Sequence, residues 1–149
     1  MRPRILALDI GEKRIGVAVS DELGITAQGL PNIEITSMKE TISKIEILLR
    51  DYNISEIVIG LPKNMDGSLG FKAEESMKFA ELLGRRTDKP VVLWDERLTT
   101  KMAHQAMLEG NLSRKKRKKK ADMIAAQLIL QSYLDSPRKN DDAKKDEES

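Results

Sequence analysis

Acidic residues at the ends of apolar segments are the strongest candidates for chemistry in this chain. Asp9 lies inside the apolar run 5–10, and Asp95 and Glu96 directly follow the apolar run 91–94. Burying a lone carboxylate is unfavourable unless a cation or strong hydrogen-bond donors compensate its charge. Asp9 is therefore either a functional carboxylate or an Asp that caps a turn, and its local sequence supports the two equally.

The adjacent acids Asp95 and Glu96 are expected to play different roles. They follow a predicted strand, at the edge where an open α/β sheet presents its ligands. Adjacent side chains of a strand point to opposite faces, so we expect only one of the two to face a site. The other is expected to bind a neighbouring loop or Arg97.

A further acid, Asp122, begins the last apolar helix that the sequence predicts. It lies three, four and seven residues before Ala125, Ala126 and Ile129, which places it on or beside the face that packs against a sheet. The alternative is a structural acid in the first turn of a helix, where the helix dipole favours a negative charge.

Carboxylates from separated segments are typical of a site for a hard cation. Mg²⁺ and Mn²⁺ prefer carboxylate oxygens, and Mg²⁺ keeps several of its waters. Two such ions about 3.5–4 Å apart can activate a water and stabilise the leaving oxygen. Asp9, Asp122 and one of the pair Asp95 and Glu96 therefore predict a Mg²⁺ or Mn²⁺ site for phosphodiester hydrolysis.

A run of seven cations lies directly before Asp122 and consists of Arg114, Lys115, Lys116, Arg117, Lys118, Lys119 and Lys120. We favour contact with a phosphate backbone, because Asp122 is adjacent. The alternatives are a solvated loop and a nuclear-localisation signal. The chain has 26 Lys and Arg against 24 Asp and Glu, so without the seven cations its net charge is −5. We therefore expect one loop to supply most of the attraction for a polyanion, with a strong dependence on salt.

Composition excludes several other kinds of site. The chain of 149 residues has no cysteine, which excludes disulfides, Cys-ligated zinc and thiol catalysis. Its single histidine, His104, excludes a site with several His ligands. No P-loop or dinucleotide-binding glycine motif is present. No apolar stretch is long enough for a signal peptide or a membrane helix, so we expect a cytoplasmic protein with no membrane partner.

The predicted elements alternate late in the chain and favour an α/β fold. Apolar runs predict strands at 5–10, 15–20, 57–59 and 91–94, with a weaker strand at 32–35. The continuous runs at 57–59 and 91–94 are expected to be buried strands. Helices are expected from an N-cap at Ser37 with Glu40, over 73–83, over about 100–109 and over about 121–134. This order predicts one domain over residues 1–136, a mixed sheet with helices on both faces, and a disordered charged tail over 137–149.

Four motifs in order along the chain resemble the YqgF (RuvX) family. They are Leu8-Asp9-Ile10-Gly11 with Lys13-Arg14-Ile15-Gly16, then Gly60-Leu61-Pro62 with Asn64-Met65-Asp66-Gly67-Ser68, then Asp95-Glu96-Arg97-Leu98-Thr99-Thr100, and finally Asp122 with Ala125-Ala126 and Ile129-Leu130. The resemblance implies an RNase H-like fold with a five-stranded mixed sheet in the order 3-2-1-4-5, strand 2 being antiparallel. It assigns the metal-binding and catalytic acids to Asp9, Glu96 and Asp122, with Asp95 as a weaker candidate.

The same resemblance implies a bacterial nuclease that acts on pre-16S rRNA during ribosome maturation. We expect Lys13, Arg14, Arg97 and the seven cations to contact phosphates, and a ribosome precursor to be a partner. One alternative is a resolvase of four-way DNA junctions, which needs a dimer to cut two strands. Another is a non-catalytic RNA-binding assembly factor. A two-domain ATPase of the actin and sugar-kinase type does not fit 149 residues. The sequence leaves the oligomeric state open.

Overall fold

The computed structural model describes residues 3–98 and 114–136, with backbone only at residue 98 and over residues 114–123. The predicted helix at 100–109, His104 and the tail at 137–149 therefore lie outside the described residues. The elements, in chain order, are β1 (Arg4–Ile10), β2 (Arg14–Ser20), β3 (Ala27–Glu34), α1 (Met38–Asp51), β4 (Ile54–Leu61), α2 (Phe71–Thr87), β5 (Val91–Asp95), the short 3₁₀ helix η1 (Glu96–Leu98) and α4 (Arg114–Leu134).

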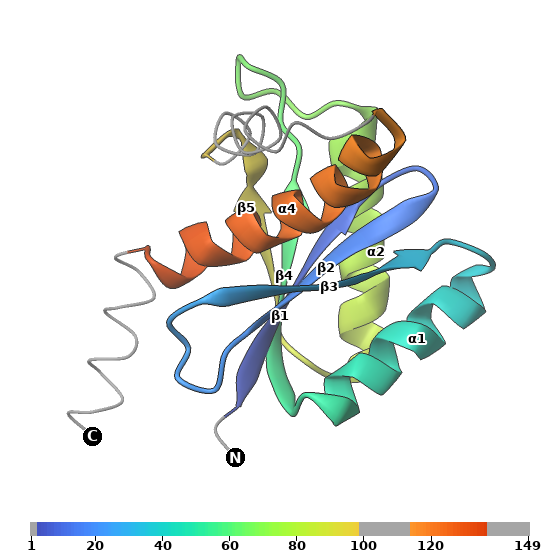
Figure 1. Cartoon of the computed structure of the whole chain (residues 1–149). Helices are drawn as coiled ribbons and strands as arrows, with labels where there is room; N and C mark the ends of the chain where they lie inside the picture. Colours follow the sequence, from blue (N-terminus) through green and yellow to red (C-terminus); the bar gives the residue numbers. More distant parts are fainter. Residues whose placement is uncertain (1–2, 99–113, 137–149) are drawn as a thin grey trace.

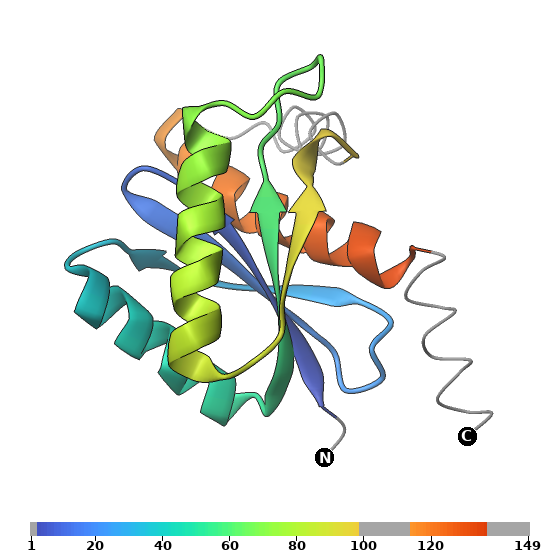
Figure 2. The same ribbon diagram turned by 180° about the vertical axis from the view of Figure 1, so that it is seen from behind.

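The five strands form one mixed sheet in the order β3-β2-β1-β4-β5. β2 runs antiparallel to β1 and β3, whereas β1, β4 and β5 are parallel. The predicted order 3-2-1-4-5 and the antiparallel second strand are confirmed. Helices α1 and α2 cover one face, and α4 crosses the other face (Figures 1 and 2).

Alternation along β1 separates the two apolar cores. Leu6 and Leu8 pack with residues of α1 and α2, whereas Ile5 and Ala7 pack with Ala126, Ile129 and other residues of α4. Because successive side chains of a strand alternate between faces, Asp9 belongs to the α4 face, two residues after Ala7. The apolar run that contains Asp9 is thus a strand buried on two faces until its last residues.

The predicted N-cap of α1 is confirmed at Ser37. Its hydroxyl accepts a hydrogen bond from the backbone N–H of Glu40 at 3.2 Å. The Glu40 carboxylate accepts a hydrogen bond from the Thr36 hydroxyl at 2.8 Å. This N-cap satisfies one of the backbone donors that the first turn of a helix leaves without an intrahelical partner.

Several elements extend beyond their predicted ranges or differ in kind. The strand expected at 32–35 extends over Ala27–Glu34. β5, expected to be buried, is the edge strand beside β4 and leaves Leu93 37% exposed. The seven cations, expected in a loop, have a helical backbone, because α4 begins at Arg114. Lys and Arg are good helix formers, and each residue added to an existing helix gains a hydrogen bond without a new nucleation cost.

No helix in the described part of the chain is both long and apolar enough to cross a membrane.

Candidate active site

The candidate site lies at the edge of the sheet where the parallel strands β1, β4 and β5 end. Asp9 is the second-last residue of β1, and Glu96 directly follows β5. Between them, β4 contributes Gly60, which pairs with Trp94 of β5. Asp9, Gly60 and Glu96 each come two residues after a side chain that packs with α4, namely Ala7, Val58 and Trp94. Strand alternation therefore places Asp9 and Gly60 on the α4 face of the sheet. Glu96, the first residue of η1, lies on the same face because its side chain meets the Gly60 position together with Ile129 of α4.

The structure brings the side chains of Asp9 and Glu96 together. The Glu96 carboxyl forms a hydrogen bond with Asp9, and its pKa is raised to about 9. Burial is the largest cause of this rise, followed by the hydrogen bond with Asp9 and the negative charges of Asp9 and Asp95. The Glu96 carboxyl thus favours its protonated form beside Asp9, and a cation bound there could take the place of that proton.

Gly60 creates the space that the Glu96 side chain occupies. A Cβ atom at position 60 would lie 2.9 Å from Glu96 Cγ, closer still to Glu96 Oε1, and 2.6 Å from Ile129 Cδ1. The Glu96 side chain therefore lies against the backbone of β4, where the Ile129 side chain of α4 also approaches. Sequence reasoning noted Gly60 only as part of a motif. A single glycine inside an apolar strand was the available signal, since it often marks a close approach to the backbone.

The other acid of the adjacent pair, Asp95, binds Arg97. Arg97 Nε and Nη2 donate to Asp95 Oδ2 at 3.0 and 2.8 Å, and the backbone N–H of Arg97 donates to Oδ1 at 3.0 Å. These hydrogen bonds lower the pKa of Asp95 below its usual value, with a smaller contribution from the positive charge of Lys63. The expectation that one acid of the pair binds Arg97 is confirmed, and the other acid, Glu96, lies beside Asp9. Asp95, the weaker metal candidate, is engaged as the partner of a guanidinium.

The third predicted acid, Asp122, belongs to α4, which covers the face that carries Asp9 and Glu96. Its side chain is not among those that the structure describes. Within the described side chains, no three His, Cys, Asp or Glu residues are grouped closely enough to hold a metal. Asp9 and Glu96 are thus the two predicted ligands that the structure brings together.

Cations lie near Glu96 and Asp95, and two of these cations were not predicted. Lys72, at the start of α2, counteracts the rise in the pKa of Glu96, and Lys63 lies close enough to act on Asp95. The predicted Lys13 and Arg14 lie at the turn that follows Asp9, where the Gly11 N–H donates to the Arg14 carbonyl at 3.0 Å. Sequence reasoning missed Lys63 and Lys72, because single lysines next to loops carry no pattern that distinguishes them from surface charge.

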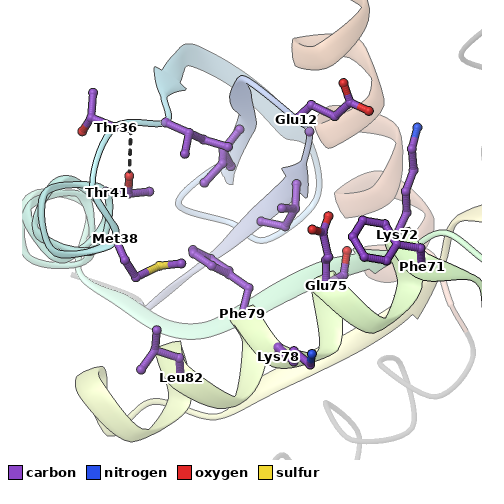
Figure 3. A pocket seen from close by; sticks show the side chains of 15 residues that line it. Glu12, Thr36, Met38, Thr41, Phe71, Lys72, Glu75, Lys78, Phe79 and Leu82 are labelled. Atoms are coloured by element: carbon purple, nitrogen blue, oxygen red, sulfur yellow. Dashed lines mark hydrogen bonds between the residues drawn. The ribbon is translucent and has the colours of Figure 1, made fainter.

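An apolar groove of about 630 Å³ lies on the opposite face of the sheet, between α1 and α2 (Figure 3). Ile10, Met38 and Phe79 contribute to its walls, and Lys72 lies at its rim beside Phe71. None of the predicted acids lines this groove. It is therefore separate from the acid pair, and Lys72 is the cation that the two features share.

The sequence matches a family model described as RuvX, Holliday junction resolvase, over residues 3–136. A relative from Clostridium tetani is 53% identical over 133 residues, covering 89% of this chain and 96% of the relative. A relative from Listeria innocua is 48% identical over 135 residues, covering 89% and 98%. Each of the two is named "Putative pre-16S rRNA nuclease".

Two solved structures share the arrangement of the sheet and helices. One is Thermus thermophilus RuvC in complex with a Holliday junction substrate, with a TM-score of 0.53 and 15% identity over 86% of this chain and 92% of the other. The second is the Fowlpox virus resolvase with Holliday junction DNA, with a TM-score of 0.53 and 17% identity over 88% and 96%. At this identity the similarity establishes the fold, which is RNase H-like as the sequence resemblance implied.

Proposed function

The chain belongs to the RuvX family, and on that basis we propose that it is a metal-dependent endonuclease that hydrolyses phosphodiester bonds in RNA. The observation that carries the proposal is the pairing of Asp9 with Glu96 above Gly60. This pair combines oxygen donors, partial burial and two like charges that a cation would neutralise. Such a site favours a hard divalent cation over a soft metal.

The residues present fit Mg²⁺ or Mn²⁺. Asp9 and Glu96 would hold the ion, and we propose Asp122 of α4 as the third ligand because its helix covers the same face of the sheet. When bound, such an ion supplies Lewis-acid stabilisation of the negative charge that develops on the phosphate oxygens. The Gly60 backbone and Ile129 fix the Glu96 side chain, so its carboxylate is in position before the substrate arrives.

The cations around the pair are suited to hold the phosphate backbone. Arg97 is oriented by Asp95 through Nε and Nη2, which leaves part of the guanidinium for a phosphate oxygen. Lys63 and Lys72 add positive charge close to the acids. We assign the same role to Lys13, Arg14 and the run from Arg114 to Lys120, which the helical start of α4 carries.

RNA is the substrate that the relatives' shared name favours. We propose that the protein trims the 5′ end of pre-16S rRNA on a ribosome precursor in the cytoplasm, and that residues 1–136 form the nuclease domain. The description of the family model favours a second candidate, cleavage of four-way DNA junctions.

A side-by-side cleavage assay separates these candidates. A fragment of precursor 16S rRNA and a four-way DNA junction are each incubated with the protein in Mg²⁺, in Mn²⁺ and in EDTA. The proposal expects metal-dependent cleavage of the RNA and intact junctions. Cleavage of the junction alone would establish the second candidate. Metal-independent RNA binding without any cleavage would show a non-catalytic assembly factor.

A further inference from the structure

The connection between β4 and α2 forms a small hairpin with an exposed apolar tip. Lys63 and Leu69 form an isolated antiparallel bridge, and we call residues 63–69 the tip hairpin. Its Met65 side chain is 93% exposed, the highest value among the exposed large hydrophobic residues of the described chain. The connection extends beyond the ends of β4 and β5 in both views of the molecule (Figures 1 and 2).

The tip hairpin is held by its own hydrogen bonds. The Asn64 N–H donates to the Ser68 carbonyl at 3.0 Å, and the Gly67 N–H donates to the Asn64 carbonyl at 2.8 Å. Asp66 Oδ1 accepts from the Ser68 N–H at 2.9 Å and from the Ser68 hydroxyl at 2.6 Å. Gly67 has a φ of +88°, which only glycine adopts without strain. The exposure of Met65 is thus imposed by a well-bonded turn.

The tip hairpin also adjoins the acid site. It begins three residues after Gly60, the position over which Glu96 lies. A Cβ atom on Gly67 would lie 3.3 Å from Arg97 Nη1, so the turn packs against the guanidinium that Asp95 orients. The opposite charges of Asp66 and Arg97 further tie the turn to this guanidinium. The turn that carries Met65 therefore lies against Arg97, a cation that we assign to the phosphate backbone.

We propose that the tip hairpin is a wedge that places Met65 against the bases beside the scissile phosphate. Proteins that distort nucleic acids insert single apolar side chains, Met among them, between base steps. The flexible thioether of Met packs against varied surfaces, so the contact selects unstacked bases without reading their sequence. Between the bridged residues Lys63 and Leu69, Met65 is the one apolar side chain, flanked by the polar Asn64 and Asp66. A single apolar side chain suits a base step better than the broad surface of a protein partner. The substrate class is thus RNA with unpaired or weakly stacked bases at the cut, and this inference rests on the proposed nuclease function.

The test compares Met65→Ala with Leu23→Ala. Leu23 is 64% exposed and follows the end of β2, which pairs with the start of β1. Its replacement therefore removes a similar exposed side chain at the opposite end of the strands from the acids. Cleavage is measured on a fully paired RNA and on the same RNA with a two-base bulge at the cut. We expect the wild-type protein to cleave the bulged RNA faster than the paired RNA. Met65→Ala should lower kcat/KM for the bulged RNA by about tenfold, which is about 1.4 kcal/mol. Leu23→Ala is expected to match wild type.

A second readout detects the wedge without cleavage. The variant Asp9→Asn is mixed with bulged RNA that carries 2-aminopurine beside the cut, and the fluorescence of this base reports unstacking. The fluorescence should rise with Asp9→Asn and fail to rise when Met65→Ala is added to it. Unchanged fluorescence and unchanged cleavage in the Met65→Ala proteins would overturn the wedge alone. If the wild-type protein cleaves RNA no faster than Asp9→Asn, the proposed function is overturned and the wedge with it.

Discussion

Replacing Gly60 with Ala tests whether the close approach of Glu96 to β4 matters for catalysis. The added methyl group would lie 2.9 Å from Glu96 Cγ and 2.6 Å from Ile129 Cδ1, whereas ordinary contacts lie at 3.4–4 Å. Ile129 is 1% exposed, so the packed core around its side chain resists displacement. Glu96 Cγ must therefore retreat by at least about 0.5 Å, and its carboxylate, which lies closer, by more.

The expected effect on activity is larger than the effect on stability. Misplacing a catalytic group by about 1 Å can lower the rate by about 100-fold. Overpacking in a filled core costs about 1–3 kcal/mol, and the flexible Glu96 side chain relieves part of this cost. Single-turnover cleavage of the rRNA fragment measures the first effect, and the urea midpoint of unfolding measures the second.

Gly84→Ala is the matched control for this substitution. Gly84 lies inside α2, and a Cβ atom there would be 3.6 Å from Val91 Cγ2, an ordinary contact. Ala at this position should raise stability by up to about 1 kcal/mol and leave cleavage unchanged. If Gly60→Ala folds and cleaves RNA at the wild-type rate, the position of Glu96 over β4 has no catalytic importance and the reasoning is refuted.

The remaining predictions concern the charges of the site. In metal-free protein, Glu96 keeps its proton up to a pKa of about 9 but releases it near 4.5 in the unfolded chain. The folded state therefore binds more protons between these values, and its stability should fall as pH rises, by up to about 1.4 kcal/mol per pH unit. Urea titrations from pH 5 to 9 measure this slope, and Glu96→Gln should flatten it; an equal slope in that variant would contradict the assignment. Asp95→Asn should free the Arg97 guanidinium and lower kcat/KM by about tenfold, mainly through KM; an unchanged KM would show that Arg97 needs no such partner. Lys72→Gln should reduce the dependence of RNA affinity on salt by roughly one phosphate contact, whereas Lys78→Gln on the same helix should not. Equal salt slopes for the two variants would remove Lys72 from the binding surface.

Local sequence patterns predicted the parts of the site that depend on strand geometry. Alternation along a strand was enough to separate Asp95 from Glu96, and the structure shows one beside Arg97 and the other beside Asp9. The cost of burying a carboxylate likewise marked Asp9 as unusual within an apolar strand. The structure places the Glu96 carboxyl beside it as a hydrogen-bond partner.

Contacts between distant segments escaped the sequence analysis. The need for Gly60 arises from a side chain 36 positions later in the chain, and only the parallel pairing of β4 with β5 brings the two together. The exposure of Leu93 likewise depends on β5 being an edge strand, which its apolar composition does not reveal. The helical backbone of the seven cations reflects the continuation of α4, which their charge alone did not indicate.

The most direct test of the acid site is the single-turnover cleavage rate of Asp9→Asn on precursor 16S rRNA in saturating Mg²⁺. Asp51→Asn is the matched control, because Asp51 is an exposed carboxylate at the end of α1. Removal of a metal ligand should lower the rate by at least about 100-fold while RNA affinity stays within a few-fold of wild type. The control should cleave at the wild-type rate. Equal rates for Asp9→Asn and Asp51→Asn would contradict the assignment of the Asp9–Glu96 pair as the catalytic centre.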